Sequence, residues 1–560
     1  MQYDQRYFTA TPNREAAREA VIRFYRQVNL LLMNHANKLH RYVAQLAKRL
    51  EQQQPPDFDN ELLNYFDSHP EYVMDSLQGL VKQLQAGMTY DDSLVRAYLF
   101  LMTFQLEHIR YQVDRHYDWA RELIAQFQQK IVELLHAGQL PDTMLIHITE
   151  ALREAKLEVA PQLFAAVEEA IEARSLQQNE PPDVNKLLTS LAEEIKGDEF
   201  DATGALTQFT YAMPVQDRVA LAAAMLSSQL LTLQNAVPLL VLDGRKEMRQ
   251  GVARLLLEVA NKLNPADLRR LITIRSWLPG KERPLIDKVI KAARQKGIDC
   301  AQWPPGEPAE IHGSVIDGSG AQGFMIVSKV GRKYRLSSVL LRLRSGIVDA
   351  WSSKELETKR TLDRQLSTAA EQTDLRIVSR AYLDRAVQHH LDAGCQNGQV
   401  PPLGLLEVAE VLGAADWHSD SLDIKATVDR LFQELPHAFR HATAITQCLQ
   451  DSQRWGAYSG ITESWFEDDQ TVANLLAASR SHRLDMLSRQ VLAEVLEPRR
   501  AKWAEQLLWV SLWLKDTSGP DDRLWVNFLL VARAVLQGQP LREIPLFTGI
   551  ASRTVMALRG

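Results

Sequence analysis

Residues 93–136 read SLVRAYLFLMTFQLEHIRYQVDRHYDWARELIAQFQQKIVELLH and contain neither glycine nor proline. Their apolar side chains recur every three or four residues, which is the spacing of one face of an α-helix. The pattern predicts one long helix, whose buried face is formed by Leu99, Met102, Leu106, Ile109, Val113, Tyr117, Ala120, Ile124, Phe127, Ile131 and Leu134.

Two further helices are predicted on the N-terminal side of this one. Apolar residues from Ala17 to Leu50 follow the same spacing, so residues 14 to about 52 are predicted to form a second long helix, which ends before Pro55 and Pro56. A shorter helix is predicted at about 59–85. Helices of this length pack as an antiparallel bundle, and we interpret residues 1–140 as an N-terminal long-helix bundle.

The overall composition is that of a folded protein, with 46% hydrophobic and 24% charged residues. A chain of 560 residues exceeds one ordinary core, so three or four domains are expected. The N-terminus MQYDQRYFTA lacks the basic and apolar regions of a signal peptide, and the longest apolar runs are far shorter than a membrane span. Because three cysteines cannot form a disulfide framework, a reducing compartment is favoured. We therefore expect a cytoplasmic protein with no membrane contact.

Residues 141–202 are predicted to form an acidic helical connector. The segment from Asp142 to Asp201 contains fourteen Asp and Glu against five Lys and Arg. Helices are predicted at about 142–154 and 159–175, and the prolines at positions 181 and 182 mark a linker.

Residues 203–300 are predicted to form four or five shorter helices. Within them the apolar run Ala236–Leu240 is followed by Asp243 and Gly244, and then by a helical run that carries Arg249 and Arg254. Residues 203–297 resemble HEAT-type repeats, in which an apolar helix, an Asp-containing turn and an Arg-bearing helix pack as one unit. The resemblance implies a HEAT-like stack of helix pairs.

Residues 309–352 interrupt the helical pattern. The runs 311–316, 324–330, 334–343 and 347–351 are rich in β-formers, with glycine turns between them. They predict an antiparallel meander of three or four strands. We read Asp317-Gly318-Ser319-Gly320 as a hairpin turn, because a phosphate-binding loop would lead into a helix. Residues 353–560 are again predicted to be helical, so the fold class is mainly α, with a helical bundle, a HEAT-like α-solenoid segment and one small inserted β-meander.

Positive charge is concentrated in residues 245–348, which contain 20 Lys and Arg against 9 Asp and Glu, although the whole chain has a net charge of −6. Such a zone predicts contact with the phosphates of a nucleic acid or with an acidic protein partner. The alternative is that it pairs with the chain's own acidic segment at 142–201. The candidate residues for an anionic partner are Arg269, Arg270, Arg275, Lys281, Arg283, Lys288, Lys291, Arg294, Arg332, Lys333 and Arg335.

The C-terminal string LREIPLFTGIASRTVMAL, residues 541–558, resembles the second and third helices of a helix-turn-helix. The resemblance implies a turn at Gly549 and a DNA-facing side formed by Ser552, Arg553 and Thr554. Pro545 departs from the family pattern, because a small residue is usual there. A plain pair of C-terminal helices is the alternative.

The sequence contains no catalytic or cofactor signature, so neither a catalytic residue nor a cofactor is predicted. His437, His441 and Cys448 could share one helix face and suit zinc, but no fourth ligand accompanies them. Our main hypothesis is a non-enzymatic helical scaffold that binds a protein partner. The alternatives are a nucleic-acid-binding regulator that uses the basic zone, and a metal-dependent enzyme.

Overall fold

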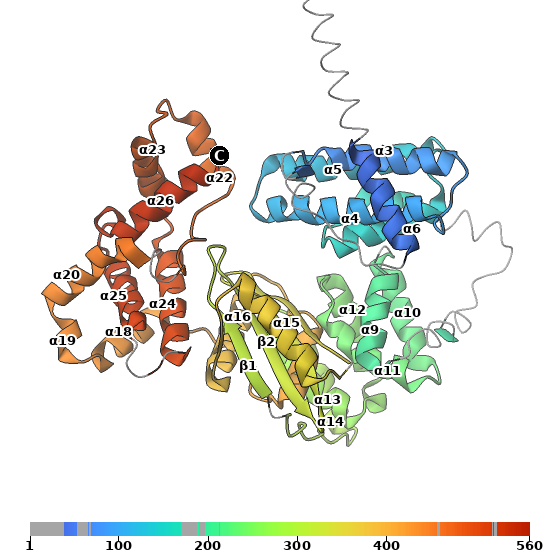
Figure 1. The fold of residues 1–560 in the computed structure, drawn as a ribbon. Coiled ribbons are helices and arrows are strands. Elements are labelled where there is room, and N and C mark those ends of the chain that lie inside the picture. The colour runs from blue at the N-terminus through green and yellow to red at the C-terminus, as the bar shows by residue number, and fades with distance from the viewer. Residues whose placement is uncertain are drawn as a thin grey trace, which may run out of the picture. The chain divides into compact units, whose positions relative to one another are not determined.

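The computed structural model describes most of the chain as two compact units, Met1–Pro181 and Pro182–Gly560 (Figure 1). The described residues are 38–52, 65–66, 69–167, 169, 188–189, 197–211, 213–307, 309–354, 356–455, 460–517, 519 and 523–559. Residues 14–37 of the first predicted helix and the predicted linker at 181–182 therefore lie outside them.

The first unit is helical, as predicted. Residues 38–51 form the described part of its first helix. Further helices follow: α3 (Tyr72–Gln85), α4 (Ser93–Asp114), α5 (Asp118–His136) and α6 (Asp142–Glu154). Residues 161–167 are also helical, within the helix predicted at about 159–175. The observed bounds of α6 match the prediction, whereas α3 begins later than the predicted helix at about 59–85.

The single helix predicted at 93–136 is wrong, because the chain breaks between α4 and α5. His116 adopts a left-handed backbone conformation with φ 62°. The amides of His116 and Tyr117 donate to the carbonyls of Val113 and Gln112, which is the Schellman arrangement that ends a helix. Glycine is the usual residue at this position, and its absence here explains why no helix end was predicted. The apolar stripe itself is confirmed, since Leu106, Phe127 and Ile131 are fully buried.

The second unit begins with a set of short helices. They are α9 (Glu199–Phe209), α10 (Val215–Ser227), α11 (Leu231–Ala236), η1 (Val237–Leu242), α12 (Lys246–Glu258), η2 (Ala260–Lys262), α13 (Pro265–Trp277) and α14 (Arg283–Gln295). Asp198 and Asn264 cap α9 and α13 with reciprocal side-chain bonds, so the sequence itself sets both helix starts. A buried ion pair between Arg249 and Glu282 joins α12 to the start of α14.

The β-rich segment forms the predicted antiparallel meander. Its strands are β1 (Ala309–Ser314), β2 (Ala321–Val330), β3 (Lys333–Arg342) and β4 (Gly346–Ser352). A fifth strand, β5 (Leu375–Ile377), pairs with β1 and gives the order β4-β3-β2-β1-β5. The sequence prediction missed β5, which follows helix α15 (Lys359–Gln372) and has only three residues.

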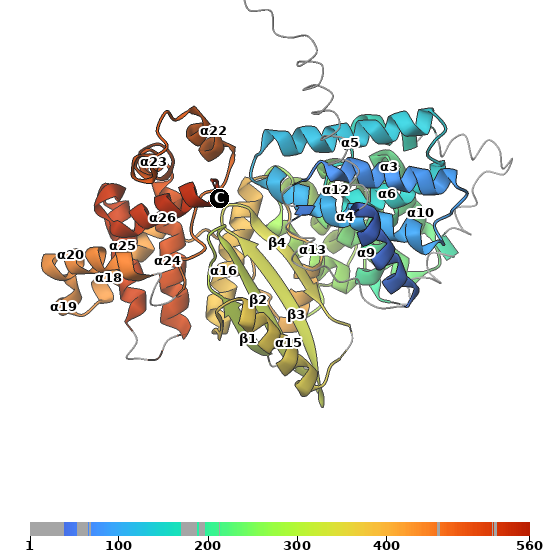
Figure 2. The same cartoon turned by 45° about the horizontal axis from the view of Figure 1, so that its top comes forward.

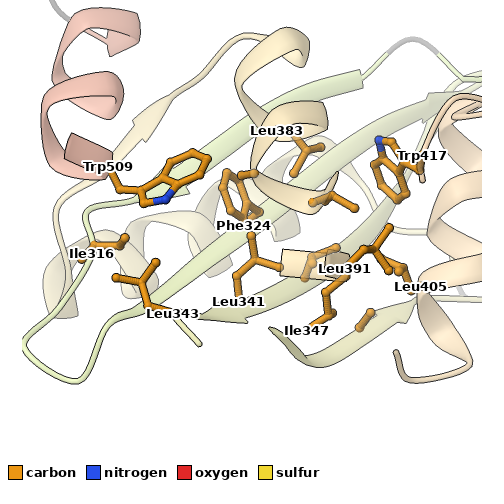
Figure 3. Close-up of a cluster of buried hydrophobic side chains, with 14 of the residues drawn as sticks. Ile316, Phe324, Leu341, Leu343, Ile347, Leu383, Leu391, Leu405, Trp417 and Trp509 are labelled. Carbon is orange, nitrogen blue, oxygen red and sulfur yellow. The ribbon is translucent and has the colours of Figure 1, made fainter. Parts of the chain in front are cut away.

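One face of the sheet carries the core of the second unit. Antiparallel register places Phe324 opposite Val339 and Gln322 opposite Leu341, and all four are buried. Helices α16 (Arg380–Gln396) and α17 (Gly404–Leu412) pack against strands β3 and β4. Figure 3 shows Leu383 and Leu391 from α16 among these strand residues. In Figure 2 the strands lie side by side with α15 and α16 against them.

The C-terminal part is helical, with α18 (Ile424–Glu434), α19 (His437–Arg440), α20 (Ala442–Asp451), η3 (Ser452–Arg454), α22 (Gln470–Ala478), α23 (Leu484–Val491) and the π-helical turn η4 (Leu492–Leu496). They are followed by α24 (Arg500–Thr517), α25 (Leu524–Leu536), η5 (Leu541–Glu543) and α26 (Pro545–Ala557). Trp503, Trp509 and Trp513 of α24 are completely buried, as core residues are expected to be. Trp513 donates its indole hydrogen to the carbonyl of Gly313 in β1 at 3.0 Å, which ties α24 to the sheet.

The hydrophobic core of the second unit extends from Leu188 to Val555. This core includes residues of the three segments at 203–300, 309–352 and 353–560, and their division into domains stays a prediction. The fold class is mainly α with one small antiparallel sheet, as predicted. In the described ranges no helix is both long and apolar enough to cross a membrane.

A substitution at the first residue of α17, Gly404, can test how closely this helix approaches the sheet. A Cβ added at Gly404 would lie 2.0 Å from the carbonyl oxygen of Ala350 in β4, and a backbone atom cannot move aside. We expect Gly404→Ala to lower the free energy of unfolding by about 1–3 kcal/mol, as measured by urea denaturation. Gly204→Ala in α9 is the matched control, because nothing lies within 4 Å of its Cβ, and it should not lose stability. Equal effects at the two positions would contradict the packing of α17 on β4.

Candidate interaction surface

The first two candidate arginines are buried, so they are not available to a partner in this structure. Arg269 and Arg270 lie on α13 and are 8% and 6% exposed. Arg269 contacts Glu410 of α17 at 2.5 Å, and Arg270 contacts the same carboxylate at 2.7 Å. Arg270 also contacts Glu199 at 2.7 Å, and Glu199 belongs to the predicted acidic segment. For these two residues, pairing within the chain replaces the predicted contact with a partner.

A second cluster extends this network. Lys354 contacts Asp198 at 2.7 Å and Glu407 of α17 at 2.5 Å. Asp198 is the N-cap of α9, so the lysine links the start of α9 to α17. We call the ion pairs of Asp198, Glu199, Arg269, Arg270, Lys354, Glu407 and Glu410 the α17 clasp.

The protonation of Glu410 depends on its two arginine partners. Burial by itself would raise the pKa of Glu410, but hydrogen bonds and charge from Arg270, and then from Arg269, outweigh it and hold the pKa below the ordinary value of 4.5. The carboxylate therefore stays ionised at neutral pH and keeps the arginines paired.

Three more candidates are held by other parts of the chain. Arg275 forms an exposed two-point ion pair with Asp287, at 2.8 and 3.1 Å. Arg283 donates to the carbonyls of Leu278 and Ser276, at the C-terminal end of α13. Arg335 donates to the carbonyl of Ser353 at 3.3 Å and lies 3.5 Å from Glu307. Their charge is thus partly or wholly used within the protein.

The remaining candidates on α14 are exposed. Lys288, Lys291 and Arg294 are spaced three residues apart on this helix, and Lys281 precedes it. None of the four forms an ion pair with another residue that the structure describes. The opposite face of α14 is anchored in the core through Ile286, Val289, Ile290 and Ala293. We call Lys288, Lys291 and Arg294 the α14 stripe.

A second exposed group lies at the turn between β2 and β3. Arg332 and Lys333 are exposed there. Tyr334 and Glu357 exchange backbone hydrogen bonds in an antiparallel bridge, which brings the chain after Glu357 alongside the turn. Lys359 and Arg360, both exposed, therefore begin α15 next to Arg332 and Lys333. These two residues were not among the predicted candidates, because only the tertiary bridge brings them to the turn.

The three predicted DNA-facing residues point into the protein instead. Thr554 is completely buried, and its hydroxyl accepts a hydrogen bond from the amide of Glu467 at 3.0 Å. Arg553 donates to the carbonyl of Trp465 at 3.1 Å. Ser552 lies 3.2 Å from the hydroxyl of Ser488 in α23. These side chains fasten α26 to its neighbours, which corrects their predicted role.

The turn predicted at Gly549 is not present. Residues Pro545–Ala557 form one continuous helix, α26, with Pro545 in its first turn. Proline is well suited to that position, because its missing amide hydrogen has no partner there. Over residues 541–558 the structure has the short turn η5 and the single helix α26, in place of the two helices that both predictions expected.

The three residues considered for zinc do not share one helix face. His441 separates α19 from α20, and its ring contacts that of His437 with centroids 4.4 Å apart. Cys448 lies apart from them, 3.6 Å from Asn527, and burial raises the pKa of its thiol to about 12. A thiol that keeps its proton is a poor zinc ligand. In the part of the chain that the structure describes, no three His, Cys, Asp or Glu side chains converge as a metal site.

Replacing Glu410 tests the α17 clasp. Glu410→Gln leaves Arg269 and Arg270 buried without their shared anion, and we expect the free energy of unfolding to fall by about 3–5 kcal/mol at pH 7. Because the folded-state pKa of Glu410 is lowered, its contribution is present above the ordinary pKa and is lost as the pH falls through the folded-state pKa. Urea denaturation at several pH values should show the two proteins converging in acid. A difference that does not depend on pH would contradict this role.

Replacing Gly549 distinguishes a continuous helix from a turn. In α26 the added Cβ meets only the flexible end of Arg553, at 3.5 Å. Gly549→Ala should therefore keep or raise stability, by up to about 1 kcal/mol, because alanine favours a helix over glycine. A clear loss of thermal stability would instead indicate a left-handed turn at this position.

Two segments of the chain match models of known families. Residues 214–297 match the Y4lR second domain, and residues 425–559 match the Y4lR C-terminal helical domain. The chain is also 27% identical over 385 residues to the uncharacterized protein y4lR of Sinorhizobium fredii (strain NBRC 101917 / NGR234), a match that covers 67% of this chain and 73% of that protein. No solved structure matches the chain. The HEAT-type stacking of residues 203–297 stays a prediction. The α14 stripe lies within the segment that is similar to the Y4lR second domain.

Proposed function

We propose that this protein is a non-enzymatic interaction scaffold that binds an acidic protein partner through the α14 stripe. The observation that carries the proposal is the contrast between two sets of cations. Arg269 and Arg270 are buried and neutralised by carboxylates, whereas Lys288, Lys291 and Arg294 are exposed and unpaired with any described residue.

The setting of the stripe suits a protein partner. Helix α14 is held in place by its buried apolar face and by contacts with α12 and α13, so the charged side chains project from a fixed backbone. Asp287 and Arg275 form an exposed ion pair beside the stripe. A protein partner can place acidic side chains opposite the stripe and a basic side chain opposite Asp287, whereas the phosphates of a nucleic acid have one uniform charge.

A nucleic-acid-binding regulator is the second candidate. It is favoured by the group at the β2–β3 turn, where Arg332, Lys333, Lys359 and Arg360 bring four exposed cations together. Phosphate backbones bind such groups without sequence preference, and the affinity falls steeply with salt.

Charge reversal on α14 tests the proposal. Two fluorescent probes, poly-L-glutamate and a DNA duplex, are titrated with the full chain at low salt, and binding is followed by anisotropy. We expect Lys288→Glu, Lys291→Glu and Arg294→Glu together to weaken binding of poly-L-glutamate by about tenfold, because each exposed charge contact contributes a fraction of a kcal/mol.

The matched control carries the same change in net charge elsewhere in the second unit. Lys425→Glu, Arg489→Glu and Arg542→Glu replace three exposed cations that lie outside α14. This variant should bind poly-L-glutamate nearly as the wild type does. An equal loss of affinity for poly-L-glutamate in both variants would overturn the proposal that the α14 stripe binds an acidic protein. Binding of the DNA duplex alone would also overturn it.

A further inference from the structure

The first unit contains a pocket that the proposed scaffold function does not use. It is lined by residues of α4 and α6 and has a volume of about 280 Å³. These two helices pack against each other (Figure 1). This volume is close to the lower end of the range for pockets that bind small molecules. Leu50, Leu99, Phe100 and Ala151 form its apolar lining.

One wall of the pocket is aromatic. The rings of Tyr90 and His147 stack in parallel, with centroids 3.6 Å apart. Burial lowers the pKa of His147 in spite of the nearby Glu150, so the imidazole is neutral at pH 7. Tyr90 is 43% exposed, and its stacking on the imidazole gives the pocket lining an aromatic surface. Aromatic faces attract cations through their ring electrons.

The polar lining is rich in hydrogen-bond acceptors. Glu150 and Glu154 lie one turn apart on α6 and both line the pocket. The hydroxyl of Thr103 donates to the carbonyl of Leu99 at 3.1 Å, so its free lone pair can accept a hydrogen bond from a ligand. Arg96 also lines the pocket and lies on α4, one turn before Phe100.

Negative charge gathers at the Glu154 end of the pocket. Burial raises the pKa of Glu154, the charges of Glu150 and Glu107 raise it further, and Arg153 opposes them. Arg153 lies 3.6 Å from Glu150 and 3.8 Å from Glu154, and is thus shared between the two carboxylates. A bound cation would relieve the repulsion among these carboxylates.

We propose that this pocket binds an organic ammonium ion carried on an apolar or aromatic body. The ammonium group contacts Glu150 and Glu154, and the body packs against Phe100 and the Tyr90–His147 stack. A bare divalent cation fits less well, because the described residues do not bring three metal-ligating side chains together here, and aromatic walls add nothing to its coordination. An anion would have Arg96 as a partner but would meet two carboxylates.

Calorimetric titration of the full chain with phenethylamine tests the proposal. Phenylacetate is the control ligand, because it has the same ring and the opposite charge, and Mg²⁺ is the control for simple charge attraction. We expect saturable binding of phenethylamine, no comparable binding of phenylacetate, and no competition by equimolar Mg²⁺.

Two variants identify the site. Glu150→Gln with Glu154→Gln preserves side-chain shape and should weaken phenethylamine binding about tenfold or more. Tyr90→Ala removes a partly exposed ring, so it should keep the fold and weaken binding several-fold. Glu122→Gln with Glu133→Gln on the exposed face of α5 is the matched control and should bind as the wild type does.

The result is decided by the wild type and the double glutamine variant. A wild-type chain that shows no saturable binding of phenethylamine overturns the proposal, and so does equal affinity in the Glu150→Gln, Glu154→Gln variant. Competition by Mg²⁺, or equal binding of phenylacetate, overturns the assignment of an organic cation. None of these results depends on the α14 stripe, so the scaffold proposal stands or fails separately.

Discussion

The second unit depends on a single carboxylate shared between two buried guanidinium groups. Glu410 of α17 pairs with both Arg269 and Arg270 of α13, although about 140 residues of sequence separate them, and Glu199 provides a second carboxylate for Arg270. Taking three charged groups out of water is unfavourable unless they pair with one another, so the network favours the placement of α13 against α17 in which they meet. Helix α17 also packs on β4, at Gly404. The position of the helical segment relative to the sheet therefore follows from this contact.

The same chemistry explains why the charge count of the sequence overstated the basic surface. The count of Lys and Arg includes side chains that donate hydrogen bonds to carbonyls or pair with buried carboxylates, and it does not distinguish them from side chains that face water. Arg283 and Arg335 are used for local hydrogen bonds, whereas Lys288 and Lys291 are exposed. The composition gives the number of charged residues, and only the folded structure shows which of them are accessible to a second molecule.

Much of the fold could be predicted from local patterns. The apolar stripes of the first unit, the helix at 142–154 and the four strands of the meander all follow from the spacing of apolar residues and from glycine turns. The break at His116 could not be predicted, because a histidine takes a backbone conformation that glycine usually signals. Strand β5 is too short to give a periodic signal, and it exists because it pairs with β1.

The candidate sites were less predictable, because they depend on contacts between distant segments. Lys359 and Arg360 join the β2–β3 turn only through the bridge between Tyr334 and Glu357. The pocket of the first unit combines Tyr90 from a loop with His147 from α6, and their spacing in sequence gives no sign of the ring contact. Thr554 seemed suited to contact DNA by its neighbours in sequence, yet its hydroxyl completes a backbone hydrogen bond inside the protein.

The hydrogen bond from Trp513 to Gly313 joins residues 200 positions apart, which has a consequence for biosynthesis. A ribosome releases β1 long before it adds the tryptophan that covers that strand. Until then the buried face of the sheet lacks part of its cover, and its apolar side chains are open to chaperones or to other nascent chains. The helices of residues 197–297 can form before their distant partner Glu410 is made, whereas the sheet reaches its final packing only when α24 has emerged. The last third of the chain thus completes the packing of a sheet whose strands β1 to β4 were synthesised earlier.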